Sequence, residues 1–263
     1  MTILEKIILH KRKEVHELKN TTSIKKMENS IFFERETLSL IKNLKEKKTN
    51  GIIAEFKRQS PSKGIINATA KVDDVVQAYM KNNAAAASIL TDEYFFGGKV
   101  EDLISARQHY IPILRKEFII DEFQIIQAKS IGADVILLIA SCLTVKQVKD
   151  FTNLATSLGL EVLLELQDEK EMNHMNSNIQ LIGINNRNLK TFEVNIENSL
   201  QMVQKIPKEC IKIAESGISK IQDVILFKQN NFDGFLIGEL FMKEKNPAAA
   251  FNLFTKQLLE YEY

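Results

Sequence analysis

From about residue 50 onward, the sequence repeats one pattern eight times: a short, nearly continuous apolar run followed by a segment with helical periodicity. Runs without apolar–polar alternation are typical of parallel strands that are covered on both faces. Eight such strand–helix units, in a chain of 263 residues, predict an α/β fold of the closed (β/α)8 type, the TIM barrel, which typically needs about 250 residues. The apolar runs occupy residues 51–56, 85–91, 111–116, 133–140, 160–166, 179–185, 210–216 and 232–238.

An open, doubly wound sheet is the structural alternative for alternating strands and helices. Such sheets usually carry a GxGxxG motif after an early strand, and none is present here. We therefore expect one barrel domain over residues 1–263. Residues typical of helix boundaries support the assignment of the helical segments: Asp121, Thr144 and Ser219 as N-caps, Gly132 and Gly159 as C-terminal stops, and Pro247 in a first turn.

Residues 1–48 precede the first predicted strand and are rich in lysine. Leu4, Ile7, Ile8, Val15 and Leu18 are spaced to form one face of a helix, and residues 31–33 add a second apolar patch. We expect a helical extension that covers the barrel and turns its lysines toward solvent.

Composition narrows the function classes. A formal net charge of +1 gives no overall field that would favour nucleic acid, and no apolar run reaches the roughly 18 residues that a membrane helix needs. No apolar signal-peptide region follows the N-terminal residues. Cys142 and Cys210 are isolated and are expected to be small buried residues in a reducing compartment. These features predict a cytoplasmic globular protein that binds neither nucleic acid nor membrane.

Polar residues gather where the predicted strands end. The first strand, for example, runs from Ile52, Ile53 and Ala54 directly into Glu55 and Lys57. Because the C-terminal ends of all strands of such a barrel meet at one mouth, these residues are expected to form a catalytic or binding cluster. The strand-end residues are Glu55, Lys57, Thr91, Asp92, Lys116, Ser141, Glu165, Asn185, Arg187, Glu215, Ser216, Gly217, Gly238 and Glu239.

The residue types at these ends indicate acid–base chemistry. None of the four histidines (His10, His16, His109 and His174) ends a strand, and there is no cysteine cluster, so a zinc or iron site is not expected. Proton transfer is then left to lysine and glutamate, whose pKa values shift toward neutrality when they are desolvated beside other charges.

A phosphate site is the second expectation. TIM barrels often bind phosphate through the loops after their last two strands, here residues 215–219 and 237–241, each of which contains a glycine. Gly97, Gly98 and Lys99 form a competing candidate. Residues 58–70 have the length and the Gly, Pro and Ser content of a loop that closes over a ligand.

Segments in this order resemble the signature segments of the indole-3-glycerol phosphate synthase family: AEFKRQSPSKG, ILTDEYFFGG, LRKEFIIDEFQI, GADVILLI, LLELQDE, GINNRNLKTFEVN, IAESGI and FLIG. The resemblance spans nearly the whole chain. It implies a reaction without metal or cofactor, in which 1-(2-carboxyphenylamino)-1-deoxyribulose 5-phosphate closes to indole-3-glycerol phosphate and loses CO2 and water. It also implies a phosphorylated small-molecule substrate, and we expect a monomer that can associate with other enzymes of tryptophan biosynthesis.

The resemblance implies a role for each matching residue. Lys116 matches the general acid that protonates the ketone oxygen, and Glu165 and Glu55 match acid–base glutamates. Lys57 matches a lysine beside the substrate carboxylate, and Asn185 matches an asparagine that orients these groups. The division of condensation and dehydration between the two lysines and two glutamates stays open at this point.

Substrate-binding positions follow in the same way. Phe96, Phe118 and Leu137 match an apolar pocket for the anthranilate ring. The remaining positions match contacts to the rest of the substrate: Arg187 and Glu215 in the substrate site, and Ser60, Ser216, Gly217, Gly238 and Glu239 toward the phosphate.

Two positions depart from the family pattern. Glu117 stands where the family usually has an aspartate after the catalytic lysine, and this longer acid should be tolerated if its side chain points outward. Some relatives have a small residue where this chain has Glu239, and we expect only its backbone N–H to face the phosphate.

Rival interpretations come from other classes. A Schiff-base aldolase would use Lys116 or Lys57 as a nucleophile, and borohydride trapping would detect it. Phosphoribosylanthranilate isomerase, another barrel enzyme, lacks the N-terminal extension and the paired lysine segments. A barrel that only binds an anion or a partner would not need the full set of acid–base residues.

Overall fold

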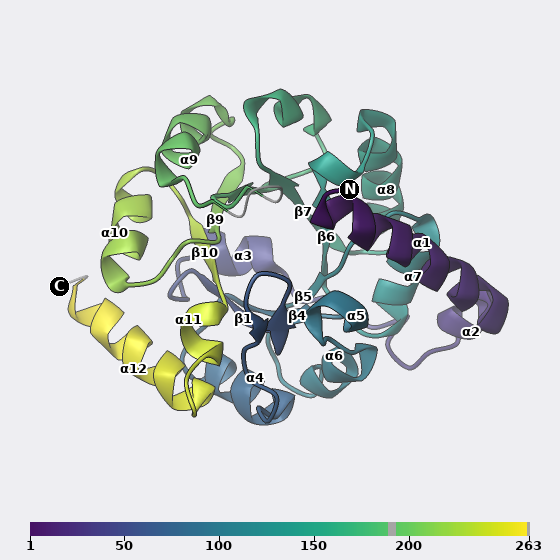
Figure 1. The fold of residues 1–263 in the computed structure, drawn as a ribbon, viewed down its shortest axis with the longest axis horizontal. Helices are drawn as coiled ribbons and strands as arrows, with labels where there is room; N and C mark the ends of the chain where they lie inside the picture. The colour runs from purple at the N-terminus through teal and green to yellow at the C-terminus, as the bar shows by residue number, and fades with distance from the viewer. Residues whose placement is uncertain (189–192, 262–263) are drawn as a thin grey trace.

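The computed structural model describes residues 1–188 and 193–261, and its centre is a closed barrel of eight parallel strands surrounded by helices (Figure 1). β1 pairs in parallel with both β10 and β4, so the sheet closes on itself and the open-sheet alternative is wrong. The predicted TIM barrel is confirmed, and every barrel strand lies within a predicted apolar run. The strands are β1 (Ile52–Phe56), β4 (Ala86–Leu90), β5 (Ile113–Lys116), β6 (Val135–Ile139), β7 (Glu161–Leu166), β8 (Leu181–Asn185), β9 (Ile211–Glu215) and β10 (Gly234–Ile237).

Helices follow the strands around the outside of the barrel (Figure 1). The segment with helical periodicity that follows the fifth apolar run, residues 168–177, contains only the 3-10 helix η2 (Glu169–His174). The principal helices are α4 (Val72–Lys81), α6 (Val100–Ala106), α7 (Glu122–Ser130), α8 (Val145–Ser157), α9 (Ile196–Met202), α10 (Ile221–Gln229) and α12 (Pro247–Glu260). Shorter elements are α5 (Glu93–Phe96), η1 (Ala140–Cys142), η3 (Val203–Lys205) and α11 (Glu239–Met242).

Most predicted helix boundaries are confirmed. Asp121 and Thr144 are the N-caps of α7 and α8, Pro247 is the first residue of α12, and Gly132 and Gly159 follow their helices with φ values of +93° and +74°. Ser219 is not an N-cap. The Asp223 carboxylate accepts hydrogen bonds from the backbone N–H groups of both Ser219 and Lys220, and α10 begins one residue later than expected, with Lys220 as its N-cap.

Strand alternation explains why apolar runs end in charged side chains. Successive residues of a strand point to opposite sides, so every second residue of a barrel strand faces the interior. Ile53, Leu114, Leu163, Leu181 and Ile213 belong to the interior cluster. The next residues on that side toward the mouth are the polar ones: Glu55, Lys116, Glu165, Asn185 (after Gly183) and Glu215.

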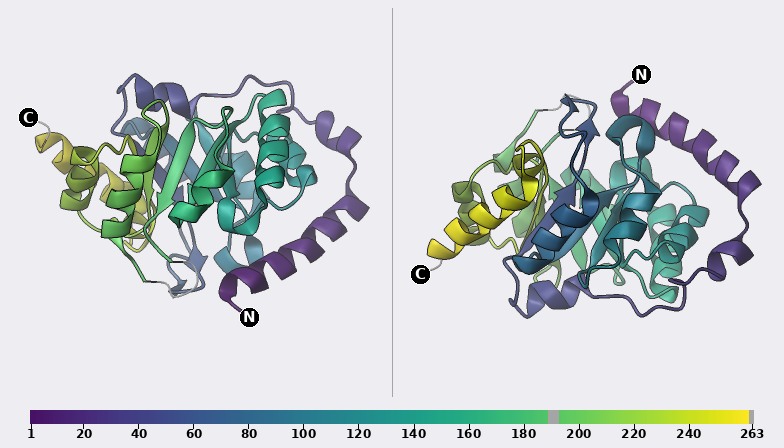
Figure 2. Two further views of the ribbon diagram at one scale, coloured as in Figure 1. Left: turned by 90° about the horizontal axis from the view of Figure 1, so that it is seen from above. Right: turned by 90° about the horizontal axis from the view of Figure 1, so that it is seen from below.

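The N-terminal extension reaches both ends of the barrel. Figure 2 shows α1 (Ile3–Thr21) and α3 (Leu40–Lys45) at opposite ends, with α2 (Ile24–Glu28) between them at the side. Leu40 and Leu44 of α3 join the interior cluster, so this helix closes the end opposite to the mouth.

The predicted apolar face of the extension is only partly correct. Ile7 and Val15 of α1 are buried, but Ile31 is 88% exposed and its side chain does not join an apolar patch. Lys11, which was expected to face solvent with the other lysines, is only 3% exposed.

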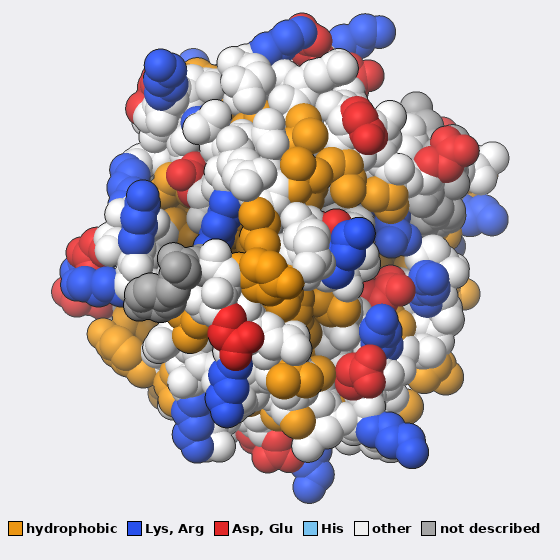
Figure 3. Space-filling model, turned by 90° about the vertical axis from the view of Figure 1, so that its left-hand side faces the viewer, with side chains coloured by type: hydrophobic (Ala, Val, Ile, Leu, Met, Phe, Trp, Pro, Cys, Tyr) orange, Lys and Arg blue, Asp and Glu red, His pale blue; other side chains and the backbone are white. Residues whose placement is uncertain are grey.

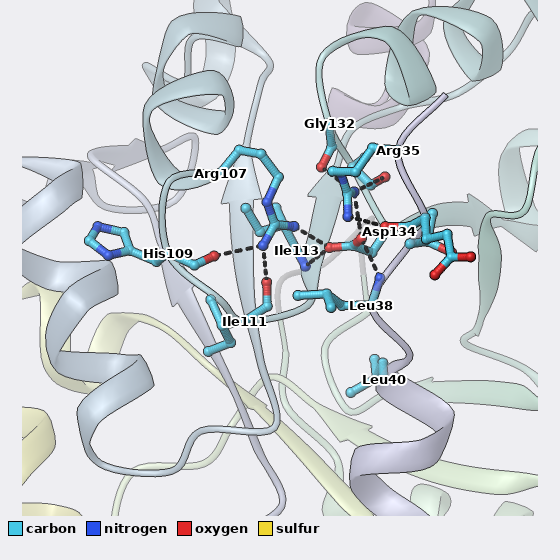
Figure 4. A network of polar contacts seen from close by, with 12 residues as sticks. Arg35, Leu38, Leu40, Arg107, His109, Ile111, Ile113, Gly132 and Asp134 are labelled. Atoms are coloured by element: carbon cyan, nitrogen blue, oxygen red, sulfur yellow. Dashed lines mark hydrogen bonds and ion pairs between the residues drawn. The ribbon is translucent and has the colours of Figure 1, made fainter. Parts of the chain in front are cut away.

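Asp134 joins this extension to the barrel (Figure 4). Its Oδ1 accepts hydrogen bonds from Arg35 Nη2 at 2.6 Å and from the Leu38 N–H at 2.8 Å, and its Oδ2 accepts from the Ile113 N–H at 2.8 Å. Arg107 Nη1 also donates to Oδ2. The carboxylate is fully buried, so these donors replace the water that it loses.

Figure 3 views the side formed by α10 and α12, where Lys and Arg side chains alternate with Asp and Glu around a band of apolar side chains. Leu226, Leu253 and Leu259 are among the exposed apolar residues of these helices. None of the helices in residues 1–188 and 193–261 combines the length and the hydropathy needed to span a bilayer.

Candidate active site

A cavity of about 320 Å³ opens at the C-terminal ends of the strands. All fifteen side chains or glycines selected from the sequence line it. Thr91, Asp92 and Ser141, which also follow strand ends, do not. The fifteen are Glu55, Lys57, Ser60, Phe96, Lys116, Phe118, Leu137, Glu165, Asn185, Arg187, Glu215, Ser216, Gly217, Gly238 and Glu239.

Lys116 lies between two carboxylates. Its Nζ donates to Glu215 Oε2 at 2.7 Å and to Glu165 Oε2 at 3.1 Å. Burial alone would lower the pKa of Lys116, but the nearby carboxylates, with Glu215 the strongest, outweigh it and hold the pKa above its ordinary value. In this structure Lys116 therefore carries the proton that a general acid needs.

Glu165 is fixed from both sides. Its Oε2 accepts from Lys116, and its Oε1 accepts from Asn185 Nδ2 at 2.9 Å. The Asn185 Oδ1 in turn accepts from the Arg187 N–H at 3.0 Å, which orients the amide. Because Glu165 is 3% exposed, these bonds set the direction in which its carboxylate faces the cavity.

Glu55 and Lys57 form a second acid–base pair, with 2.6 Å between Oε1 and Nζ. They are two residues apart at the end of β1 and therefore lie on the same side of the chain. Gly238 leaves room for this pair, because a Cβ at Gly238 would lie 2.7 Å from Glu55 Oε1. Gly238 is therefore required by the close approach of the Glu55 carboxylate.

Glu215 is the most buried of the three glutamates at 1% exposure. Burial, opposed by Lys116 and reinforced by Glu165 and Glu55, raises the pKa of Glu215 to about 7. Its Oε1 has no hydrogen-bond partner within the described part of the chain. A Cβ at Gly183 would lie 2.0 Å from that oxygen, so this glycine is also required by a neighbouring carboxylate.

One end of the cavity is aromatic and apolar. The rings of Phe96 and Phe118 lie with their centroids 5.8 Å apart and tilted by 36°, and Leu137 is buried beside them. α1 adds Ile3, Leu4 and Ile7 to the lining. The sequence pattern assigned Leu4 and Ile7 to a covering face, but it gave no signal that this face would also line the cavity.

The other end offers donors for an anion. Ser216 and Gly217 have φ values of +65° and +74°, which form a tight turn after β9. Ser62 and Lys243, which the sequence analysis did not select, also line the cavity. Lys63 Nζ lies 3.6 Å from Glu239 Oε1, so the Glu239 carboxylate has a cationic partner in the loop after β1.

The same loop contacts the opposite wall, where Arg187 Nη1 donates to Ser62 Oγ at 3.2 Å. Residues 189–192 of the quoted segment GINNRNLKTFEVN lie outside the described residues. Gly97 ends α5 with a φ of +61°, and neither it, Gly98 nor Lys99 lines the cavity. The competing phosphate candidate is therefore a helix-terminating turn.

The Glu117 side chain does not point outward, so the longer acid is accommodated in another way. Glu117 is 4% exposed, and its carboxylate accepts from Thr91 Oγ1 at 2.7 Å and forms an ion pair with Lys11. These buried donors compensate the desolvation of the carboxylate. The surroundings of Lys11, 106 positions away in the sequence, could not be read from the local pattern.

Residues outside this cavity give little sign of other chemistry. Cys142 and Cys210 are free thiols whose pKa values are raised by burial, the condition of unreactive cysteines. Across residues 1–188 and 193–261, no three His, Cys, Asp or Glu side chains are grouped so that they could hold a metal ion.

Residues 4–254 match the family model described as indole-3-glycerol phosphate synthase. The chain is 44% identical over 257 residues to the indole-3-glycerol phosphate synthase of Bacteroides thetaiotaomicron, covering 97% of this chain and 98% of the relative. It is 40% identical over 253 residues to the enzyme of the same name from Polaromonas naphthalenivorans, covering 94% and 96%.

Solved structures give a likeness in fold. A tryptophan synthase alpha-subunit from Pyrococcus furiosus matches with a TM-score of 0.61 at 12% identity, over 80% of this chain and 98% of that one. A 3-hexulose-6-phosphate synthase from Salmonella typhimurium matches with a TM-score of 0.62 at 15% identity, over 80% and 99%. At such identities the likeness concerns the barrel architecture alone.

Proposed function

The chain belongs to the indole-3-glycerol phosphate synthase family, and from that membership we propose how its side chains divide the work of the reaction. The enzyme is a carboxy-lyase of tryptophan biosynthesis that acts on a phosphorylated small molecule. Its substrate, 1-(2-carboxyphenylamino)-1-deoxyribulose 5-phosphate, closes to indole-3-glycerol phosphate with loss of CO2 and water.

The two ends of the cavity suit the two ends of this substrate. The anthranilate ring lies against the pair formed by Phe96 and Phe118, where ring–ring contact is favourable. The phosphate lies at the opposite end, against the turn at Ser216 and Gly217, Ser60 and the backbone of Gly238 and Glu239. Glu239 keeps its carboxylate on Lys63, which reduces its repulsion of the phosphate.

Lys116 is the general acid of ring closure. The ring carbon that carries the carboxylate attacks the ketone carbon, and the ketone oxygen takes a proton from the Lys116 ammonium. The observation that carries this assignment is the contact of Lys116 Nζ with both Glu165 and Glu215 inside the cavity, which keeps the lysine charged and directed inward. The substrate carboxylate then leaves as CO2, and its electron pair restores the aromatic ring.

Dehydration requires an acid for the departing hydroxyl and a base for the proton that leaves the neighbouring carbon. Glu165 and the Glu55–Lys57 pair supply these groups, because both carboxylates are buried at the cavity and hydrogen-bonded to a lysine. Lys57 faces the substrate carboxylate before it is lost, and Asn185 holds Glu165 in place. Arg187 lies at the rim and closes the site together with the loop after β1.

The test is product formation in EDTA, followed by indole fluorescence. The chain contains no Trp, so an indole emission that grows with time comes from the product. Lys116→Met should lower kcat by a factor of about 10² to 10⁴, the range for loss of a general acid. Lys99→Met is the matched control: it removes an exposed lysine of the rejected phosphate candidate and should leave kcat unchanged.

Full activity of folded Lys116→Met protein would reject the assigned acid, and absence of product with wild-type protein would reject the proposed mechanism altogether. Activity in EDTA would support a reaction without a metal. We further propose a single-domain monomer that acts in the cytoplasm and can associate with other enzymes of the pathway.

A further inference from the structure

Lys11 is a buried lysine on a helix whose other lysines are exposed. Its Nζ lies 2.9 Å from Asp92 Oδ2 and 3.0 Å from Glu117 Oε1, and it also contacts Glu14 of the same helix. Asp92 follows β4 and Glu117 follows β5. One ammonium group of the N-terminal extension therefore joins two neighbouring strand ends of the barrel.

Each of these carboxylates also holds the backbone that carries a ring of the cavity. Asp92 Oδ1 accepts from the Phe95 N–H at 2.8 Å and so caps α5, the helix that ends in Phe96. Glu117 Oε1 accepts from the Phe118 N–H at 2.8 Å. The bridge between the two carboxylates is thus a bridge between the supports of Phe96 and Phe118.

The charges in this cluster are balanced and shielded from water. Asp92 is fully buried, and Glu117 and Arg115 are 4% and 2% exposed. Arg115 Nε donates to Thr91 Oγ1 at 3.1 Å, and Thr91 donates to Glu117. Among the buried groups, two cations (Lys11 and Arg115) face two anions (Asp92 and Glu117), and the partly exposed Glu14 also pairs with Lys11. Loss of Lys11 leaves an uncompensated negative charge between the two ring supports.

Ring contacts beside the cluster hold α1 against α5. The His10 ring lies 4.5 Å, centroid to centroid, from the Tyr94 ring and 5.7 Å from that of Phe95. Lys11 itself does not line the cavity, whereas Leu4 and Ile7 of the same helix do. The position of α1 is therefore coupled to the shape of the aromatic end.

We propose that Lys11 is a positioning residue of the ring-closing reaction. Lys11 fixes the separation of Phe96 and Phe118 and thereby the position in which the substrate ring binds. This role rests on the proposed function, in which those two rings hold the anthranilate group. It also gives the N-terminal extension an indirect part in substrate binding, through a residue that does not line the cavity.

The test compares the two ends of the cavity in Lys11→Met. Steady-state kinetics give KM and kcat, while anthranilate and glycerol phosphate serve as competitive inhibitors for the ring end and the phosphate end. We expect KM and the inhibition constant of anthranilate to rise by about tenfold, since small misplacements of a binding group have effects of this order. The inhibition constant of glycerol phosphate should stay within about twofold of wild type, because its contacts are intact.

Lys19→Met is the matched control. Lys19 lies on the same helix and pairs with Asp121 at 2.7 Å, but it is exposed and has no link to either ring. Its removal should leave KM and both inhibition constants unchanged. If Lys11→Met does not fold, Lys11→Arg keeps the charge with a different shape, and it should raise the anthranilate constant selectively, by a smaller factor.

Equal weakening of both inhibitors, or no change of either in a folded Lys11 variant, would overturn the positioning role. These outcomes differ from a failure of the proposed function. In that case wild-type protein itself would form no indole product, whereas here wild-type turnover is normal and only the variants are compared.

Discussion

Glu215 shows how the barrel tunes a single residue. The interior gives its carboxylate almost no water, which disfavours the charged form, while Lys116 at 2.7 Å favours it. Glu165 and Glu55 add negative charge nearby, and the balance leaves a pKa of about 7 against an ordinary 4.5. Glu215 can therefore hold or release a proton at neutral pH, next to the lysine assigned as the general acid.

This raised pKa predicts a pH-dependent stability. Between about pH 4.5 and 7 the folded protein binds a proton at Glu215 that the unfolded chain releases, so the contribution is complete at low pH and is lost as pH rises through 7. In Glu215→Gln this dependence disappears. Relative to the variant, wild type should lose on the order of 3 kcal/mol of unfolding free energy from pH 4.5 to 8.

Urea unfolding of both proteins at intervals from pH 4.5 to 8 measures this difference directly. Because other raised carboxyls, such as Glu161 and Glu171, are present in both proteins, their contributions cancel in the comparison. Parallel stability curves for the two proteins would show that Glu215 titrates near its ordinary pKa.

At the scale of elements, the loop after β1 is an ordered hairpin that hydrogen bonds fix to the barrel. β2 (Gln59–Ser60) and β3 (Gly64–Ile65) form an antiparallel hairpin whose tip carries Pro61 and Ser62 to the cavity. Its base is held by Asn67, whose N–H donates to the Arg58 carbonyl at 3.0 Å and whose Nδ2 donates to the Met242 carbonyl at 3.1 Å. The hairpin is thereby tied to the end of α11, beside the phosphate end of the cavity.

Asn67→Ala should loosen this hairpin without disturbing the barrel. We expect KM to rise by about three- to tenfold, because the loop must then be ordered when substrate binds, and limited proteolysis at the hairpin tip to become faster. Asn50→Ala is the matched control. Asn50 makes similar bonds, from Nδ2 to the Asn82 carbonyl and from the Ile52 N–H to Oδ1, but before β1 at the opposite end. An equal rise of KM in both variants would exclude a local role for Asn67.

Elements of different length were predictable to different degrees. The barrel strands follow from apolar runs, since burial on both faces leaves a signal in four to six successive residues. The hairpin at residues 59–65 and the four-residue α5 left no such signal, because they depend on contacts such as that of Asp92 with the Phe95 N–H. Strand-end logic placed eleven residues at one cavity, and the family resemblance added Ser60, Phe96, Phe118 and Leu137. Neither could find Lys243, or Ile3 of α1, which reach that cavity from other segments.

Lys11 marks the limit of the same reasoning. Helical periodicity assigns a lysine of a surface helix to solvent, and the carboxylates that bury Lys11 lie 81 and 106 positions later in the sequence, at Asp92 and Glu117. Only tertiary structure brings the three charges together. A buried lysine without a partner would instead lose its proton or disrupt the fold.

At the scale of the whole molecule, the N-terminal extension packs against both ends of the barrel (Figure 2). α1 contributes to the cavity at the mouth, and α3 packs Leu40 and Leu44 into the opposite end. Between them, Arg35 and the Leu38 N–H bind Asp134 (Figure 4). The part of the extension that lines the cavity (α1) and the part that closes the opposite end of the barrel (α3) thus belong to one continuous segment. The two parts are held by different contacts.

Asp134→Asn tests whether these two ends are independent. The carboxylate faces Arg35, Arg107 and two backbone N–H groups, and an amide has one acceptor oxygen and adds two donors of its own. Burial already lowers the pKa of Arg107, so its guanidinium depends on this carboxylate. Breaking one partner of a buried ion pair typically costs about 3–5 kcal/mol, which urea unfolding would detect as a lower transition midpoint.

Arg35→Gln is the graded control, because Arg35 is partly exposed and its removal leaves Arg107 paired with Asp134. It should cost about 1 kcal/mol. Since Asp134 precedes β6 and the reacting groups lie past the other ends of the strands, both variants should keep the wild-type kcat and KM at temperatures where they are folded. A fall of kcat that follows the loss of stability in the two variants would instead mean that the extension transmits strain from one end of the barrel to the other.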